Sequence, residues 1–250
     1  EFEDGLVQIY DNLKNGKSNP AINLTSRANQ DFNQPLRDDL PDLSNYAYLI
    51  VGDGTTKMVG YTEASRGCKH KCRHCPVVPV YKGRFRIIDS EIVIADVRQQ
   101  ISNGAEHISF GDPDFFNGPG HAVKIITALN KEFPQISYDA TIKIEHLLKH
   151  KSLIPTLKET GCLFITTAVE SVEENILKIL DKGHTKEEFE LVAEITKKVG
   201  VPISPTFVPF TPWTTKQGFI SLLDTIAELG LIENVAPIQL AIRLLVPNKS

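Results

Sequence analysis

The sequence lacks several features that would tie the protein to a membrane or to secretion. It has only four cysteines among 250 residues, and three of them are clustered, which does not look like a secreted disulfide framework. Its longest apolar runs, such as residues 163–169, are far too short to span a bilayer. No signal peptide is visible. We therefore expect a cytoplasmic protein without a membrane partner.

An excess of one charge is also missing. The chain has 27 basic and 31 acidic residues, a net charge of −4, and no basic stripe that would suggest nucleic acid as a partner. The fractions of hydrophobic residues (41%) and charged residues (23%) are ordinary for a globular protein. The chain is long enough to form a stable hydrophobic core without disulfides or structural metals. The chain starts at Glu1 and its one methionine is Met58. We expect a part of a longer protein, with a tail beyond Ser250.

The first 57 residues differ in character from the rest. They are polar and rich in Asn, Asp and Pro, which predicts an N-terminal extension of mostly loop, with one possible short strand at residues 46–54. From Met58 to Ser250 the pattern changes to alternating strands and helices. Six strands are predicted, at residues 58–65, 106–110, 135–144, 162–171, 201–210 and 235–247.

Each of the first five strands is followed by a predicted helix. Strict alternation with crossover helices implies a parallel sheet. Six such units are too few for the usual closed barrel of eight. The sequence therefore predicts an α/β fold whose sheet forms an open, partial (β/α)6 barrel of the TIM type.

The chemistry-bearing motif follows the first strand, where Cys68, Cys72 and Cys75 form a Cys-x3-Cys-x2-Cys loop. In βα architectures this end of a strand is where sites are built. Thiolates at this spacing can wrap one soft metal centre, but a structural zinc site or an ordinary [4Fe–4S] cluster takes four ligands. Cys162 begins a later strand, at the opposite edge of the sheet, and is read as a small buried hydrophobe. A cluster held by three thiolates would leave one iron open to a small molecule.

This loop resembles that of the radical S-adenosylmethionine (SAM) superfamily. The resemblance covers residues 58–247 and implies that Cys68, Cys72 and Cys75 bind a [4Fe–4S] cluster whose open iron is chelated by SAM. It further implies that one electron from the reduced cluster breaks a carbon–sulfur bond of SAM and starts radical chemistry on a small-molecule substrate. A reductase, flavodoxin or ferredoxin would supply that electron.

The resemblance also implies SAM contacts beside the loop. Gly111, Asp112 and Pro113 match the Gly-Glu-Pro part of a motif that family members place after the second strand. Asp112 would accept a hydrogen bond from the SAM amino group, with Asp114 as a rival. His74 stands where the family usually has an aromatic residue, so it would contact the adenine, or else it is a surface histidine of the loop.

Further contacts are expected at the ends of later strands. Glu170 and Ser171 resemble a Gly-x-Glu-Ser stretch and would bind the ribose or the methionine part of SAM. Lys143 and Glu145 share one face of the third strand, as cofactor contacts or as a salt bridge at the barrel mouth. Arg243, inside the last predicted strand, would need an anion: the SAM carboxylate, the substrate, Glu170 or Glu145.

Several segments resemble one subgroup in more detail. They are residues 63–86, 111–121, 141–148 and 205–215. These segments are similar to radical SAM proteins with a CUAEP or CCAEP tail, some of them selenoproteins, and to enzymes of arsinothricin biosynthesis. The superfamily resemblance implies the usual 5′-deoxyadenosyl radical, which abstracts hydrogen from the substrate. The subgroup resemblance implies instead transfer of the 3-amino-3-carboxypropyl group of SAM to trivalent arsenic, and both possibilities stay open.

Alternatives remain open at this stage. The chain could be a non-catalytic iron–sulfur protein for electron transfer or sensing, or a zinc module with His70 or His74 as fourth ligand. The basic residues Lys82, Arg84 and Arg86 form either a solvated loop or a docking patch for an acidic electron donor.

Overall fold

The computed structural model describes residues 3–18 and 31–245, and its contacts divide the chain into two units, with the boundary between Asn33 and Gln34. In the first unit, α1 (Glu3–Lys14) is a helix with Leu6, Tyr10 and Leu13 on one side. No helix was predicted before residue 58, so the sequence prediction is wrong here. Among the described residues, no helix combines the length and apolar character needed to cross a membrane.

The second unit is built on a curled sheet in the order β1-β2-β5-β6-β7-β8. Its strands are β1 (Tyr48–Ile50), β2 (Thr56–Thr62), β5 (His107–Phe110), β6 (Ser137–Thr141), β7 (Cys162–Glu170) and β8 (Ile203–Phe207). β1 runs antiparallel to β2, and every later pair is parallel. The predicted α/β fold with an open partial barrel is confirmed, as is the short strand within residues 46–54.

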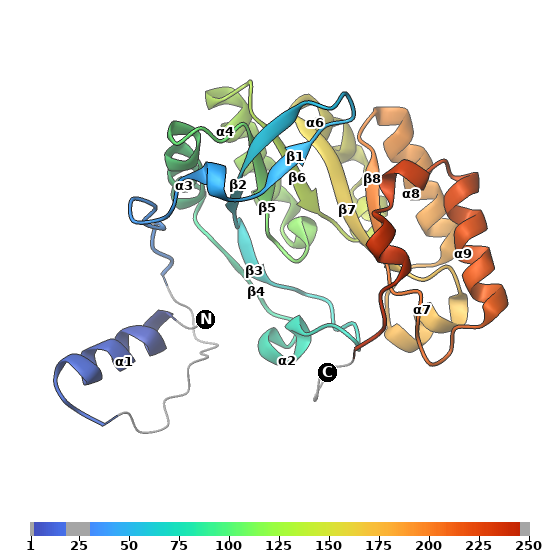
Figure 1. The fold of residues 1–250 in the computed structure, drawn as a ribbon, viewed down its shortest axis with the longest axis horizontal. Coiled ribbons are helices and arrows are strands. Elements are labelled where there is room, and N and C mark those ends of the chain that lie inside the picture. Colours follow the sequence, from blue (N-terminus) through green and yellow to red (C-terminus); the bar gives the residue numbers. More distant parts are fainter. Residues whose placement is uncertain (1–2, 19–30, 246–250) are drawn as a thin grey trace. The chain divides into compact units, whose positions relative to one another are not determined.

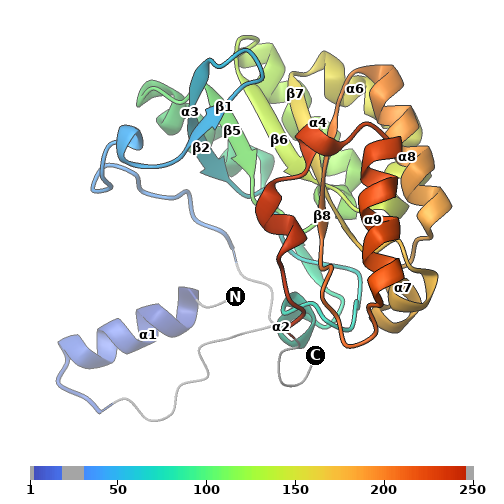
Figure 2. The same ribbon diagram turned by 45° about the vertical axis from the view of Figure 1, so that its right-hand side comes forward.

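Helices follow the parallel strands and cover the outer face of the sheet (Figure 2). They are α3 (Ser90–Ser102), α4 (Pro119–Glu132), α5 (Ile144–Lys149), α6 (Ile154–Glu159), α7 (Glu174–Leu180), α8 (Lys186–Val199) and α9 (Lys216–Glu228). Local sequence sets their ends: α8 starts at a capping box of Thr185 and Glu188 and stops at Gly200, whose φ is 78°.

The sixth predicted strand, at residues 235–247, is wrong. Up to residue 245 this segment holds a 3-10 helix, Pro237–Leu240, and one parallel bridge between Phe210 and Arg243. Pro237 has no N–H to donate to a ladder, which favours the turn. Within the described residues, the barrel therefore consists of five parallel strands plus the antiparallel β1.

The two faces of the sheet differ in polarity. The Tyr138 hydroxyl lies 2.9 Å from Thr160 Oγ1, directly after α6, so Tyr138 faces the outer helices and its neighbours Ser137 and Asp139 face inward. There His107 lies 2.9 Å from both Ser137 Oγ and Asp139 Oδ1, and Ser109 donates to Asp139. The concave face is therefore lined by polar, hydrogen-bonded side chains.

Candidate active site around the cysteine loop

The three clustered cysteines lie in a long loop after β2. This loop begins with β3 (Ser65–Gly67), contains α2 (Val77–Tyr81), and returns through β4 (Phe85–Ile87), which pairs antiparallel with β3 (Figure 1). Gly67 is required where the loop leaves β3, since its φ is 80° and a Cβ would lie 2.5 Å from the Arg84 carbonyl oxygen. The cysteines thus follow the carboxyl end of β2, the edge of the sheet where βα folds place their sites.

Asn117, at the end of a short 3-10 helix after β5, fixes the loop. Its Oδ1 accepts from the Lys69 N–H at 3.1 Å and lies 3.9 Å from Cys68 Sγ, while its Nδ2 donates to the Gly67 carbonyl at 3.4 Å. On the other side, the Arg73 N–H donates to the Leu180 carbonyl. Asn117 is not among the predicted site residues, although its position shortly after the Gly111–Pro113 motif is a usable signal.

The thiols are free and sit in partly buried surroundings. Cys72 is buried, and Cys68 and Cys75 are half-buried. Burial raises the pKa of the Cys68 thiol, so the thiol form is favoured until a cation binds. The buried Lys143 ammonium lies 3.8 Å from Cys72 Sγ, where it attracts the negative charge that bound thiolates carry.

Glu170 and His74, both predicted SAM contacts, meet at the end of β7. Glu170 Oε1 lies 3.1 Å from His74 Nε2 and 3.2 Å from Lys182 Nζ. Burial alone would raise the pKa of Glu170, but the His74 hydrogen bond and the Lys182 charge outweigh it and hold the pKa below its usual value. Glu170 has φ +69° at a register shift in the β7–β8 pairing, a strained conformation that turns its carboxylate towards the loop.

Asp112 follows β5 and lies beside the start of the cysteine loop, which it contacts at Ala64 and Ser65. Its Oδ2 accepts from the Ala64 N–H at 2.9 Å and its Oδ1 from the Ser65 hydroxyl at 2.6 Å. Burial raises the pKa of Asp112 to about 6. A Cβ at Gly111 would lie 1.8 Å from the Tyr61 hydroxyl, so the exposed Tyr61 side chain would have to move to admit one. Both Asp112 oxygens are engaged inside the protein, and its role in binding SAM stays a prediction.

The remaining predicted residues fall into two groups. The predicted shared strand face of Lys143 and Glu145 is wrong, because β6 ends at Thr141 and Glu145 lies on α5; the two residues do form a 3.6 Å ion pair beside the loop. Ser171 accepts from the Glu173 N–H at the start of α7. Arg243, by contrast, is exposed in irregular chain. Up to residue 245, the chain around Arg243 forms one isolated bridge and no strand, so the premise of that prediction is wrong.

A pocket of about 630 Å³ borders the concave face at the β2 edge. Tyr61 and Ser109, which are paired across β2 and β5, line it together with Arg37, Tyr46 and Gln100. Gln100 closes the open edge of β2 by bonding both the N–H and the carbonyl of Tyr61. This pocket can admit a small molecule next to the polar inner face.

Comparison with known proteins identifies the class that this fold and cysteine loop define. The model of the radical SAM superfamily matches residues 62–226, more than half of the chain, so the chain belongs to that superfamily. Its cofactors are accordingly a [4Fe–4S] cluster and SAM, and three free thiols in one loop beside a buried lysine fit such a cluster.

Relatives and solved structures agree with this assignment. The chain is 27% identical over 187 residues to a tRNA-2-methylthio-N(6)-dimethylallyladenosine synthase from Fusobacterium nucleatum, covering 66% of this chain and 40% of the relative. It is 23% identical to the ribosomal protein uS12 methylthiotransferase RimO from Clostridium acetobutylicum, over 75% of this chain and 45% of that protein. The chain thus spans less than half the length of these curated relatives.

Among solved structures, the fold resembles the methyltransferase TsrM from Kitasatospora setae with cobalamin and a [4Fe–4S] cluster bound. The TM-score is 0.60 at 17% identity, covering 70% of this chain and 35% of TsrM. The cobalamin-dependent radical enzyme OxsB gives a TM-score of 0.57 at 22% identity, with 66% of this chain and 26% of OxsB covered. At these identities the likeness concerns the fold alone.

Proposed function

We propose that this chain cleaves SAM reductively at a [4Fe–4S] cluster bound by Cys68, Cys72 and Cys75. The observation that carries the proposal is the position of Cys162. It begins the nine-residue β7, so it lies about 26 Å from the loop end of that strand at about 3.3 Å per residue. A fourth thiolate from Cys162 is thus out of reach, which leaves one iron for SAM.

The surrounding residues have separate proposed tasks. When bound, the cluster supplies one electron that breaks a carbon–sulfur bond of SAM. Lys143 balances the charge of the thiolate-ligated centre, and the Glu170–His74 pair, held by Lys182, offers hydrogen bonds to the ribose or methionine part of SAM. The segment Gly111–Pro113 would lie along the methionine amino group.

The substrate is proposed to be a small molecule bound at the concave face. The pocket beside Tyr61 and Ser109 and the polar group around His107 and Asp139 support this assignment. For the electron, we propose a flavodoxin, ferredoxin or reductase docking near the exposed residues Lys82 and Arg84. We place this reaction in the cytoplasm, without nucleic acid or membrane partners.

The finer proposal is transfer of the 3-amino-3-carboxypropyl group of SAM to trivalent arsenic. It is supported by the similarity of residues 63–86, 111–121, 141–148 and 205–215 to arsinothricin-biosynthesis enzymes. In this reaction the one electron from the cluster would cleave the bond between sulfur and the aminocarboxypropyl group, releasing 5′-methylthioadenosine. The resulting carbon radical would add to trivalent arsenic, and return of one electron to the oxidised cluster would complete the carbon–arsenic bond. The reaction is therefore redox-neutral overall, with arsenic oxidised from the trivalent to the pentavalent state.

One product analysis tests both levels of the proposal. The anaerobically reconstituted protein is reduced with dithionite, mixed with SAM with and without arsenite, and the SAM fragments are identified. 5′-Methylthioadenosine that increases with arsenite supports the transfer. 5′-Deoxyadenosine as the product keeps the SAM cleavage and removes the arsenic proposal, and S-adenosylhomocysteine would point instead to methyl transfer. Absence of any fragment contradicts SAM cleavage and favours a non-catalytic iron–sulfur protein.

A further inference from the structure

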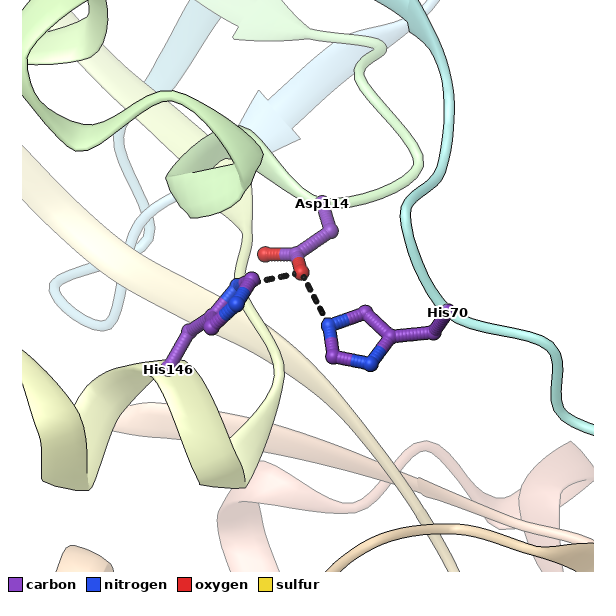
Figure 3. A group of neighbouring side chains, drawn as sticks. All are labelled: His70, Asp114 and His146. Atoms are coloured by element: carbon purple, nitrogen blue, oxygen red, sulfur yellow. Dashed lines mark ion pairs between the residues drawn. The ribbon is translucent and has the colours of Figure 1, made fainter. Parts of the chain in front are cut away.

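Next to the cysteine loop, three side chains typical of metal sites converge from three separate segments. His70 lies in the loop between Cys68 and Cys72, Asp114 follows β5, and His146 lies on α5 (Figure 3). Asp114 Oδ2 is 2.6 Å from His146 Nδ1 and 3.5 Å from His70 Nε2. All three atoms lie within 4.8 Å of one another.

These three atoms are buried and without hydrogen bonds. Within the described part of the chain none of them meets the geometry of a hydrogen bond, and Asp114 Oδ2 instead forms ion pairs with both rings. Buried polar atoms normally find a partner, since leaving one unpaired costs about 1–3 kcal/mol. A cation between the three atoms would satisfy all of them at once.

The distances suit such an ion. With bonds of about 2.0–2.1 Å and tetrahedral angles, neighbouring ligand atoms of zinc lie about 3.3 Å apart. The two separations from Asp114 Oδ2, 2.6 and 3.5 Å, lie on either side of this value. The nitrogens of the two rings lie within 4.8 Å of each other, so the rings would move closer together on binding the ion.

The other polar atoms of these side chains are arranged as supports. Asp114 Oδ1 faces the backbone N–H groups of Phe116 and Lys143, at 3.3 and 3.4 Å, which leaves Oδ2 for a metal. His70 Nδ1 lies 3.5 Å from Glu145 Oε2. A carboxylate behind a histidine orients the ring and increases its basicity in known metal centres.

We propose that His70, Asp114 and His146 bind one divalent transition-metal ion, with zinc as the ion, separate from the iron–sulfur cluster. Two imidazoles and one carboxylate form a ligand set that zinc accepts, with one position left for water. The ion would tie the cysteine loop to the end of β5 and to α5, because His70 lies midway between two cluster cysteines.

The test measures zinc and iron together in the anaerobically purified, cluster-reconstituted protein. After equilibration with ZnCl₂ and gel filtration, elemental analysis should give about one zinc in addition to the cluster iron. His146→Gln and Asp114→Asn should each lose that zinc and keep the iron. His150→Gln is the matched control, since His150 packs 6.0 Å from His146 without belonging to the set, and it should keep both metals.

A second variant separates this proposal from the proposed function. Cys72→Ala should lose iron and keep the zinc, so failure of the cluster assignment would leave the zinc result intact. Less than about 0.2 zinc per wild-type chain, or equal zinc in wild type and His146→Gln, overturns the metal site. One extra iron that disappears with His146→Gln supports the ligand set and overturns the choice of zinc. Thermal melts of each variant exclude loss of metal through unfolding.

Discussion

The two edges of the central sheet differ in whether their buried polar groups have hydrogen-bond partners. At the amino edge, Cys162 donates to the Phe164 carbonyl, and the Tyr138 hydroxyl bonds Thr160, so polar atoms are paired within the fold. At the carboxyl edge, buried nitrogens and oxygens without a hydrogen-bond partner gather among the described residues: His70 Nε2, His74 Nδ1, Asp114 Oδ2, His146 Nδ1 and both ring nitrogens of His184.

This difference distinguishes polar groups that stabilise the fold from polar groups that are available for ligands. Pairing at the amino edge stabilises the fold. Buried groups at the carboxyl edge that lack a hydrogen bond, including Asp114 with its ion-paired histidines His70 and His146, keep bonding capacity that a ligand would use. Asp112 and Glu170, two buried carboxylates at this edge, show how hydrogen-bond partners determine a pKa. Asp112 accepts only from neutral donors, and burial raises its pKa to about 6, while Glu170 is equally buried but has cationic partners that keep its pKa low.

The largest effect is expected from replacing the cluster ligands at the carboxyl edge. Replacing Cys68, Cys72 or Cys75 with Ala should remove the cluster and all SAM cleavage, because three thiolates hold it and none is spare. Iron content, visible absorbance and product formation measure this. Cys162→Ala is the control and should keep all three readouts. Loss of the cluster in Cys162→Ala would contradict the three-ligand site.

A smaller effect is expected at Glu170. Glu170→Gln removes the charge that faces Lys182 and His74, and hydrogen bonds to charged groups are worth about 1.5–3 kcal/mol, so SAM binding should weaken about tenfold to hundredfold. Titration of the reduced cluster spectrum with SAM measures this. Glu173→Gln, three residues further on, is the matched control and should bind SAM like wild type.

The Glu170 result is informative only beside the melting temperature. If the stability of Glu170→Gln fell while SAM affinity stayed unchanged, the residue would be structural. The proposed contact would then be wrong.

Protonation at the carboxyl edge gives a stability effect with a defined sign. Burial lowers the pKa of His184 from 6.5 to about 4, so the unfolded chain binds this proton more readily than the folded one. The stabilising contribution is complete above pH 6.5 and is lost as the pH falls towards 4, by about 3 kcal/mol at most.

Urea unfolding of cluster-free protein between pH 4 and 7 measures the His184 effect. Wild type should lose stability relative to His184→Gln as the pH falls, and the ionisation of Asp112, shared by both proteins, cancels in this difference. A pH-independent difference would show that His184 is not held neutral by the fold.

Local signals in the sequence predicted much of this molecule. The cysteine spacing, the alternation of strands and helices and the capping residues act over a few positions, so they are readable without a structure. The His74–Glu170 pair joins residues 96 positions apart, and the His70–Asp114–His146 set joins three segments. Such contacts depend on how the crossover helices place strand ends, which no local pattern reports.

Two errors have particular causes. The polar composition of the α1 segment favours a loop prediction, although Leu6, Tyr10 and Leu13 recur at helical spacing. The apolar run at residues 235–247 predicts a last strand, but Pro237 has no N–H for a ladder and the segment forms a 3-10 helix there. The assignment of Arg243 to the barrel interior depends on that strand.

The smallest effect is expected at Arg243, which tests whether this residue lies outside the functional site at the carboxyl edge. Because Arg243 is exposed and follows irregular chain, Arg243→Ala should change the unfolding free energy by no more than about 0.5 kcal/mol and SAM affinity by less than about twofold. Urea unfolding and the spectral SAM titration measure both. A tenfold loss of SAM affinity with unchanged stability would mean that this arginine swings inward when the cofactor binds, and the sequence prediction of an anion partner for Arg243 would be restored.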